Sequence, residues 1–160
     1  MMDQVYEQIY VGDIETLRQQ DAVRQEGIDA VVRLDLRDRD ALHWDSRFKV
    51  LDMPINDGAS VPDDVFDRVT AFIHQHIQDE KTVLVHCNMG VSRSTTMVIA
   101  YLIQYEGMSL GEAFGTVREG RDVARPHGAL MASLIDYYDL PYTPQEAYSP
   151  QFLTKLLHDA

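Results

Sequence analysis

The sequence predicts a three-layer α/β domain in which a small central mixed sheet is flanked by helices. Short apolar strand patterns alternate with amphipathic helix patterns early in the chain, and helix patterns dominate later. The segment 82–86 is continuously apolar, which is typical of a strand buried on both faces of a sheet. The segment 94–105 is apolar nearly all round, and this predicts a central, buried helix.

Turn residues and apolar spacing divide the chain into elements. The expected strands cover 5–11 (with a turn inside it), 29–34, 48–53 and 82–86. The expected helices cover 13–26, 62–77, 94–105, 109–117 and 128–138. Gly27 and Gly107 end two of these helices, and Ser109 with Glu112 predicts a capping box at the start of another.

A charged, aperiodic stretch over 35–47 is expected to be a surface loop. Arginines and aspartates alternate there and at the end of the strand before it: Arg33, Asp35, Arg37, Asp38, Arg39 and Asp40. Because each positive charge has a negative neighbour, the pattern favours a solvated loop over an anion-binding patch.

Composition limits the partners of the protein. The 160 residues carry a net charge of −12, so nucleic acid and membranes are poor partners for the surface at large. No stretch approaches the roughly 20 apolar residues of a membrane span, and the N-terminus lacks the pattern of a signal peptide. We therefore expect a cytoplasmic protein.

One domain is expected over residues 1–140, followed by a tail over 141–160. The tail contains a short helix pattern and is expected to pack on the domain. Its aromatic residues are expected to join that packing rather than to form a docking motif: Tyr142, Tyr148 and Phe152.

The chain has one cysteine, in the segment 86–94, which reads His-Cys-Asn-Met-Gly-Val-Ser-Arg-Ser between the buried strand and the buried helix. A single cysteine forms no internal disulfide and supplies no zinc-binding set, so it is either a small buried hydrophobe or a reactive thiol. A strand–loop–helix junction directs backbone N–H groups and the positive end of the helix dipole at one centre. Such a centre binds an anion and stabilises the Cys87 thiolate.

Five further residues of this segment fit the same centre. Gly90 permits a backbone conformation that a side chain would forbid. Arg93, six positions after the cysteine, can bring a planar fork of N–H donors over two phosphate oxygens. Ser94 or Ser92 can donate a hydrogen bond to the sulfur, and His86 is expected to orient the loop through hydrogen bonds to the backbone.

This segment resembles the signature loop of the cysteine-dependent protein tyrosine phosphatases, His-Cys-x5-Arg-Ser/Thr, in their dual-specificity branch. The resemblance extends over about residues 5–138 and includes 9–12, 27–32 and Arg125-Pro126. It implies a phosphatase-like fold with the Cys-x5-Arg loop between strand and helix, and catalysis through a phosphocysteine without metal or cofactor. It also implies the residues that hold the phosphate: Asn88, Met89, Gly90, Val91, Ser92 and Arg93.

The resemblance further implies one aspartate, on a loop before the signature, that protonates the leaving oxygen and then activates water. Asp57, 30 residues before Cys87, matches that position. Asp52 is the rival, but it falls within a predicted strand. The alternative interpretation of Asp57 is a turn residue whose side chain bonds the backbone before Gly58.

The implied partner is a phosphorylated protein, with phosphotyrosine hydrolysed and phosphoserine or phosphothreonine as an open extension. All five residues between Cys87 and Arg93 are neutral, whereas branches acting on phosphoinositides usually carry lysines there. Phosphatases for lipid, RNA or small-molecule phosphates stay open as an alternative, as does a catalytically weak phospho-binding module. Completeness of the catalytic set, with Ser94 and Asp57 included, favours catalysis. The oligomeric state is left open.

Overall fold

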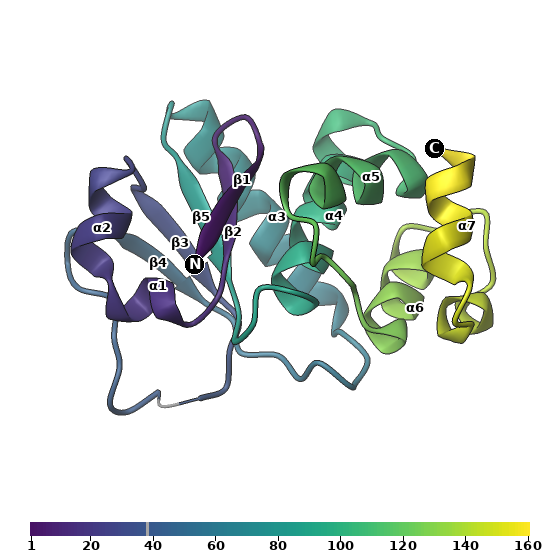
Figure 1. Ribbon diagram of the computed structural model, residues 1–160, viewed down its shortest axis with the longest axis horizontal. Coiled ribbons are helices and arrows are strands. Elements are labelled where there is room, and N and C mark those ends of the chain that lie inside the picture. The colour runs from purple at the N-terminus through teal and green to yellow at the C-terminus, as the bar shows by residue number, and fades with distance from the viewer. Residues whose placement is uncertain (38) are drawn as a thin grey trace.

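The computed structural model describes residues 1–37 and 39–160 and shows a five-stranded sheet between two helical layers (Figure 1). The strands lie in the order β1-β2-β5-β3-β4. Their bounds are β1 (Met2–Tyr6), β2 (Ile9–Gly12), β3 (Ala30–Arg33), β4 (Lys49–Asp52) and β5 (Val83–His86). β1 pairs antiparallel with β2 and all other pairs are parallel, so the predicted three-layer domain with a mixed sheet is confirmed.

The strand predicted over 5–11 is a hairpin made of β1 and β2. Glu7 has a φ of 46°, in the left-handed region that a tight turn requires, and it lies where the sequence predicts a turn. The first strand begins at Met2, before the predicted start, because Met2 pairs with Gly12 at the far end of β2.

The described helices are α1 (Glu15–Arg18), α2 (Gln20–Gln25), α3 (Asp63–Gln78), α4 (Arg93–Glu106), α5 (Leu110–Gly120), α6 (Gly128–Tyr137), the 3₁₀ helix η1 (Pro144–Tyr148) and α7 (Phe152–Asp159). The single helix predicted over 13–26 is therefore wrong, because the chain breaks at Gln19 with φ −125° and ψ 49°. Leu17 and Val23 are both buried, and one straight helix would turn side chains six positions apart about 120° away from each other. The break lets both reach the core.

Two hydrophobic cores lie on the two faces of the sheet. Val83 and Val85 point into the larger core, which is shared with α3, α4, α5 and α6. Leu84, between them on β5, points to the other face and packs with Val23 and Phe48. β5 is thus fully buried, as its continuously apolar sequence predicts, and α4 is buried over residues 94–102.

The sheet brings three loops together at one edge. Gly12, His86 and Arg33 lie in register at the ends of the parallel strands β2, β5 and β3. The carboxyl ends of parallel strands meet at the same edge, where ligands bind in open α/β sheets. The loop that follows His86 therefore begins between two others.

Residues beyond Leu140 fold back over the helical layer in Figure 1, where η1 contacts α6 and α7 contacts α5. Phe152 is 3% exposed and Leu156 is fully buried. The backbone of α7 lies so close to α5 that a Cβ at Gly111 would be 2.8 Å from the carbonyl oxygen of Leu156. Among the helices described, none has the length and apolar character needed to cross a membrane.

Candidate active site

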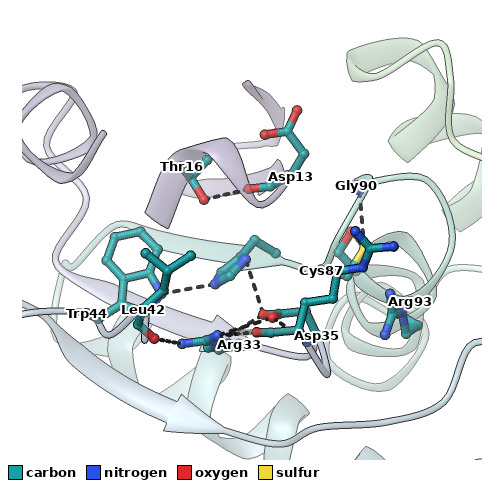
Figure 2. A network of polar contacts seen from close by, with 12 residues as sticks. Asp13, Thr16, Arg33, Asp35, Leu42, Trp44, Cys87, Gly90 and Arg93 are labelled. Atoms are coloured by element: carbon teal, nitrogen blue, oxygen red, sulfur yellow. Dashed lines mark hydrogen bonds and ion pairs between the residues drawn. The ribbon is translucent and has the colours of Figure 1, made fainter. Parts of the chain in front are cut away.

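Cys87 lies directly after β5 and is 2% exposed. Its Sγ accepts a hydrogen bond from the backbone N–H of Gly90 at 3.3 Å (Figure 2). The Oγ of Ser94 also lies within hydrogen-bond reach of the sulfur, at 3.3 Å. Of the two serines proposed from the sequence, Ser94 is the one that reaches the sulfur. Ser92 instead uses its Oγ to accept the backbone N–H of His127 at 2.8 Å.

The backbone of the loop after Cys87 turns its carbonyl groups outward. The carbonyl of Asn88 accepts from Ile14 N–H at 2.9 Å, and that of Val91 accepts from Arg125 N–H at 2.7 Å. The carbonyls of the two residues between them bond to the Arg121 side chain. In a planar trans peptide the C=O of one residue and the N–H of the next point in opposite directions. Four successive N–H groups, those of residues 89–92, are therefore directed inward.

Arg121 anchors this loop from the end of α5. Its guanidinium is buried and donates through Nε to the carbonyl of Gly90 at 2.6 Å and through Nη2 to that of Met89 at 3.3 Å. Nη1 forms an ion pair with Asp3 on β1 at 2.8 Å. Sequence reasoning missed Arg121, because one arginine just past a helix end carries no periodic signal.

Gly90 has the conformational role that the sequence predicts. Its φ is +66°, in the left-handed region that side chains disfavour. A Cβ there would also lie 2.6 Å from Nη2 of Arg121 and 2.8 Å from the carbonyl oxygen of Gly12. Both the backbone angle and the lack of space require glycine.

Arg93 and Asp57 face the same cavity as Cys87. The cavity has a volume of about 640 Å³ and includes all three residues in its lining. Arg93 donates through Nη1 to the carbonyl of Ile55 at 3.1 Å, while its Nε has no partner in the described part of the chain. The Oδ1 of Asp57 is likewise buried without a partner there. A buried polar atom without a partner is costly, so these two atoms are well suited to a polar ligand.

The two candidate aspartates lie in different environments. Asp52 ends β4, forms an ion pair with Arg39 and does not line the cavity. Asp57 lies on the loop between β4 and α3. The turn before Gly58 is made by Asn56, whose Oδ1 accepts the N–H of Gly58 at 2.9 Å, so the side chain of Asp57 is not used for it.

His86 is fully buried at the end of β5, and its side chain accepts a hydrogen bond from Trp44. Its Nε2 lies 3.0 Å from the indole N–H of Trp44, which can only donate, so the ring proton belongs on Nδ1. Burial lowers the pKa of His86 to about 4, although the nearby Asp35 carboxylate opposes this shift. A neutral ring therefore supports the loop, and Nδ1 lies 4.0 Å from Oδ1 of Asp35.

The prediction of a solvated charged stretch is wrong for Arg33 and Asp35. Both are buried, with Nε and Nη2 of Arg33 donating to the two carboxylate oxygens at 2.9 and 3.2 Å. Arg33 also donates to the carbonyl of Leu42 at 2.6 Å, which ties the following loop to the sheet. Arg37 is exposed as expected, whereas Asp38 lies outside the described residues.

These contacts define what the site can do chemically. The sulfur lies before the amino end of α4 in a loop whose N–H groups are directed inward, and the guanidinium-bearing Arg93 lines the same cavity. Such an arrangement suits a tetrahedral oxyanion. A carboxyl group faces the same cavity. Within the described residues, no group of three or more His, Cys, Asp or Glu side chains is arranged to hold a metal ion.

The sequence of the chain is similar to those of known proteins. A family model described as "Dual specificity phosphatase, catalytic domain" matches residues 9–140. Protein 123R of Invertebrate iridescent virus 6, whose name assigns it to the tyrosine phosphatases, is 29% identical over 138 residues, covering 83% of this chain and 89% of the viral protein. Dual specificity protein phosphatase 14 of Homo sapiens is 38% identical over 92 residues, covering 57% of this chain but only 46% of the human protein.

The fold is also shared with a solved structure. The crystal structure of human DUSP28 superimposes with a TM-score of 0.78 at 21% identity, and covers 86% of this chain and 93% of that one. At this identity the likeness shows the fold alone. The residues beyond 140 lie outside the segment that the family model matches.

Proposed function

The chain belongs to the dual specificity phosphatase family and is a cysteine-dependent protein phosphatase, and from this premise we propose that Cys87 hydrolyses phosphotyrosine in proteins through a phosphocysteine intermediate. The observation that carries the proposal is the convergence of three groups on one cavity. Cys87, Arg93 and Asp57 all line it, and among the described residues Nε of Arg93 and Oδ1 of Asp57 are buried polar atoms without a partner.

In the first step, the Cys87 thiolate attacks phosphorus, so that a P–S bond forms while the P–O bond to the leaving group breaks. Arg93 and the inward N–H groups hold the equatorial oxygens and stabilise their charge. The carboxyl group of Asp57 gives its proton to the departing oxygen.

In the second step, the Asp57 carboxylate takes a proton from water while the water oxygen attacks phosphorus. The P–S bond breaks, phosphate is released and the thiolate is restored. The Gly90 N–H and the Ser94 hydroxyl, each 3.3 Å from the sulfur, stabilise it as a leaving group. His86 is neutral and buried, so we assign it the role of positioning the start of the loop rather than that of a base.

The substrate class and the location are parts of this proposal. Five neutral residues separate Cys87 from Arg93, which favours a protein phosphate over a phosphoinositide, and the net charge of −12 disfavours nucleic acid and membranes. The cytoplasmic location stays a prediction.

The test is phosphate release from sequence-matched phosphotyrosine and phosphothreonine peptides in the presence of EDTA, with Cys87→Ser alongside. We expect release from the phosphotyrosine peptide, and no release by Cys87→Ser, which still binds the peptide. Release from lipid or nucleotide phosphates alone would replace the protein substrate. Binding without release from any phosphate ester would show a phospho-binding module, and turnover by Cys87→Ser would refute the mechanism.

A further inference from the structure

The cavity around Cys87 is closed on one side by the C-terminal segment. The residues of this wall come from the end of η1 and the start of α7: Ala147, Tyr148, Ser149, Pro150 and Leu153. None of them lies within residues 9–140, the part of the chain that the family model matches. The wall is therefore built by residues that follow the matched catalytic segment.

Tyr148 packs against the first residue of α6, close to the phosphate-binding loop. The backbone N–H of His127 bonds to Ser92 of the phosphate-binding loop, and His127 is followed by Gly128, the first residue of α6. A Cβ at Gly128 would lie 3.0 Å from Cδ1 of Tyr148 and 3.1 Å from the carbonyl oxygen of Ala147. The ring of Tyr148 thus packs against Gly128, the residue that follows His127 in the chain.

The wall is held by contacts on both sides of Tyr148. Thr143 and Glu146 form a capping box at the start of η1, and Glu146 also pairs with Lys155 of α7 at 3.4 Å. Phe152 and Leu156 bury α7 against the domain. An aromatic ring carried by such an anchored segment is positioned before any ligand arrives, which lowers the entropic cost of binding.

The two most exposed of the large apolar side chains recorded for the described residues both line this cavity. Met89 is 67% exposed and Tyr148 is 61% exposed, more than any other large apolar side chain recorded as exposed. Both line the cavity, one from the phosphate-binding loop and the other from the wall. Large apolar groups left open in a site are expected to contact an apolar part of the ligand.

We propose that Met89 and Tyr148 flank the ring of a phosphotyrosine residue, so that the wall selects aryl phosphates over alkyl phosphates. Both a thioether and an aromatic ring interact favourably with an aromatic ring placed beside them. The side chains of phosphoserine and phosphothreonine present no ring to contact. This inference rests on the proposed function, since it needs the phosphate bound at Cys87.

The test measures binding rather than turnover, using Cys87→Ser as background and matched phosphotyrosine and phosphothreonine peptides in calorimetric titrations. We expect Tyr148→Ala to lower the affinity for the phosphotyrosine peptide about 3–10-fold. Affinity for the phosphothreonine peptide should change by less than about twofold, since it makes no ring contact. Tyr148→Phe should keep the preference, and Met89→Ala should reduce it.

Leu157→Ala is the matched control, because Leu157 is 42% exposed on the same segment but does not line the cavity. It should keep the affinities of the background. If Tyr148→Ala does not fold, Tyr148→Leu, which keeps bulk without a ring, takes its place. Equal losses on both peptides, no loss on either, or no binding of the phosphotyrosine peptide would each overturn the proposed contacts with the ring. Turnover by the unmodified chain is measured separately, so a failure of the phosphatase activity is distinguished from a failure of these contacts.

Discussion

Two loops line the cavity, one after Cys87 (the cysteine side) and one that carries Asp57 (the acid side), and their hydrogen bonds to the rest of the protein differ. On the cysteine side, the carbonyls of residues 88–91 all accept a hydrogen bond from a neighbouring segment. On the acid side, the loop is bonded at its ends, by Ile55 N–H to Leu34 at 3.1 Å and by Val61 N–H to Ser133 at 2.9 Å. Between these ends the bond that the structure records is the local one from Gly58 to Asn56.

This difference fits the two tasks. Stabilising a developing oxyanion requires dipoles that do not reorganise, so the N–H groups of the cysteine loop must be fixed. The carboxyl of Asp57 needs only to reach the leaving oxygen, and a loop that adjusts to the substrate can achieve this. Arg93 joins the two sides, because its Nη1 donates to the carbonyl of Ile55 two residues before the acid.

The largest effect should come from Asp57→Asn. We expect kcat to fall about 10²–10⁴-fold, because the leaving group loses its proton donor. The free energy of unfolding should not fall, because Oδ1 of Asp57 has no partner to lose among the described residues. The pH–rate profile should lose the limb that depends on the acid. Asp52→Asn is the control and should keep the profile, and a profile that moves with Asp52 instead would reassign the acid.

The sharpest comparison of the two sides uses one substitution at two glycines. Gly90→Ala should lower kcat/KM by up to about 10²-fold and lower the melting temperature, because the loop must shift by about an ångström to admit the Cβ. Gly58→Ala should leave both near the values of the unmodified protein, because the nearest atom to a Cβ there is 3.7 Å away. Equal effects at the two positions would refute the contrast between a fixed and an adjustable side.

A smaller effect concerns stability and follows from the neutral His86. Between its ordinary pKa of 6.5 and the folded value of about 4, the unfolded chain binds a proton that the folded chain does not. The free energy of unfolding should therefore fall as the pH falls through this window, by up to about 3 kcal/mol. Denaturant titrations of His86→Gln should show a shallower dependence. His158→Gln, which removes an exposed histidine, should keep the original slope, and identical slopes for all three proteins would contradict the assignment.

The features that the sequence predicts correctly are those with local causes. The strand–loop–helix junction from 83 to 106, the requirement for glycine at 90 and the capping box of Ser109 with Glu112 each depend on residues a few positions apart. Asp57 was also placed correctly in a loop, because turn residues surround it in the sequence. Each of these signals lies in one continuous stretch of the sequence.

The features that the sequence does not predict depend on distant partners. Trp44 meets His86 across 42 positions and Arg121 meets Gly90 across 31, and no periodicity records such pairs. The spacing of Arg33 and Asp35 does indicate that they can pair, but the alternating charges around them also fit a solvated loop. Residues two apart along an extended strand share a face, so they can pair with each other inside the protein.

The loop around Cys87 is completed by segments from far apart along the chain. Its supports are Gly12 and, through Arg121, Asp3 on one side, and Arg125 and His127 on the other. During synthesis at about 5–20 residues per second, the 34 positions from Cys87 to Arg121 take about 2–7 s. Throughout that interval the nascent chain carries the thiol without its anion-binding surroundings. The cysteine is therefore synthesised before the groups that surround it, and its site is completed only when the chain has been made as far as His127.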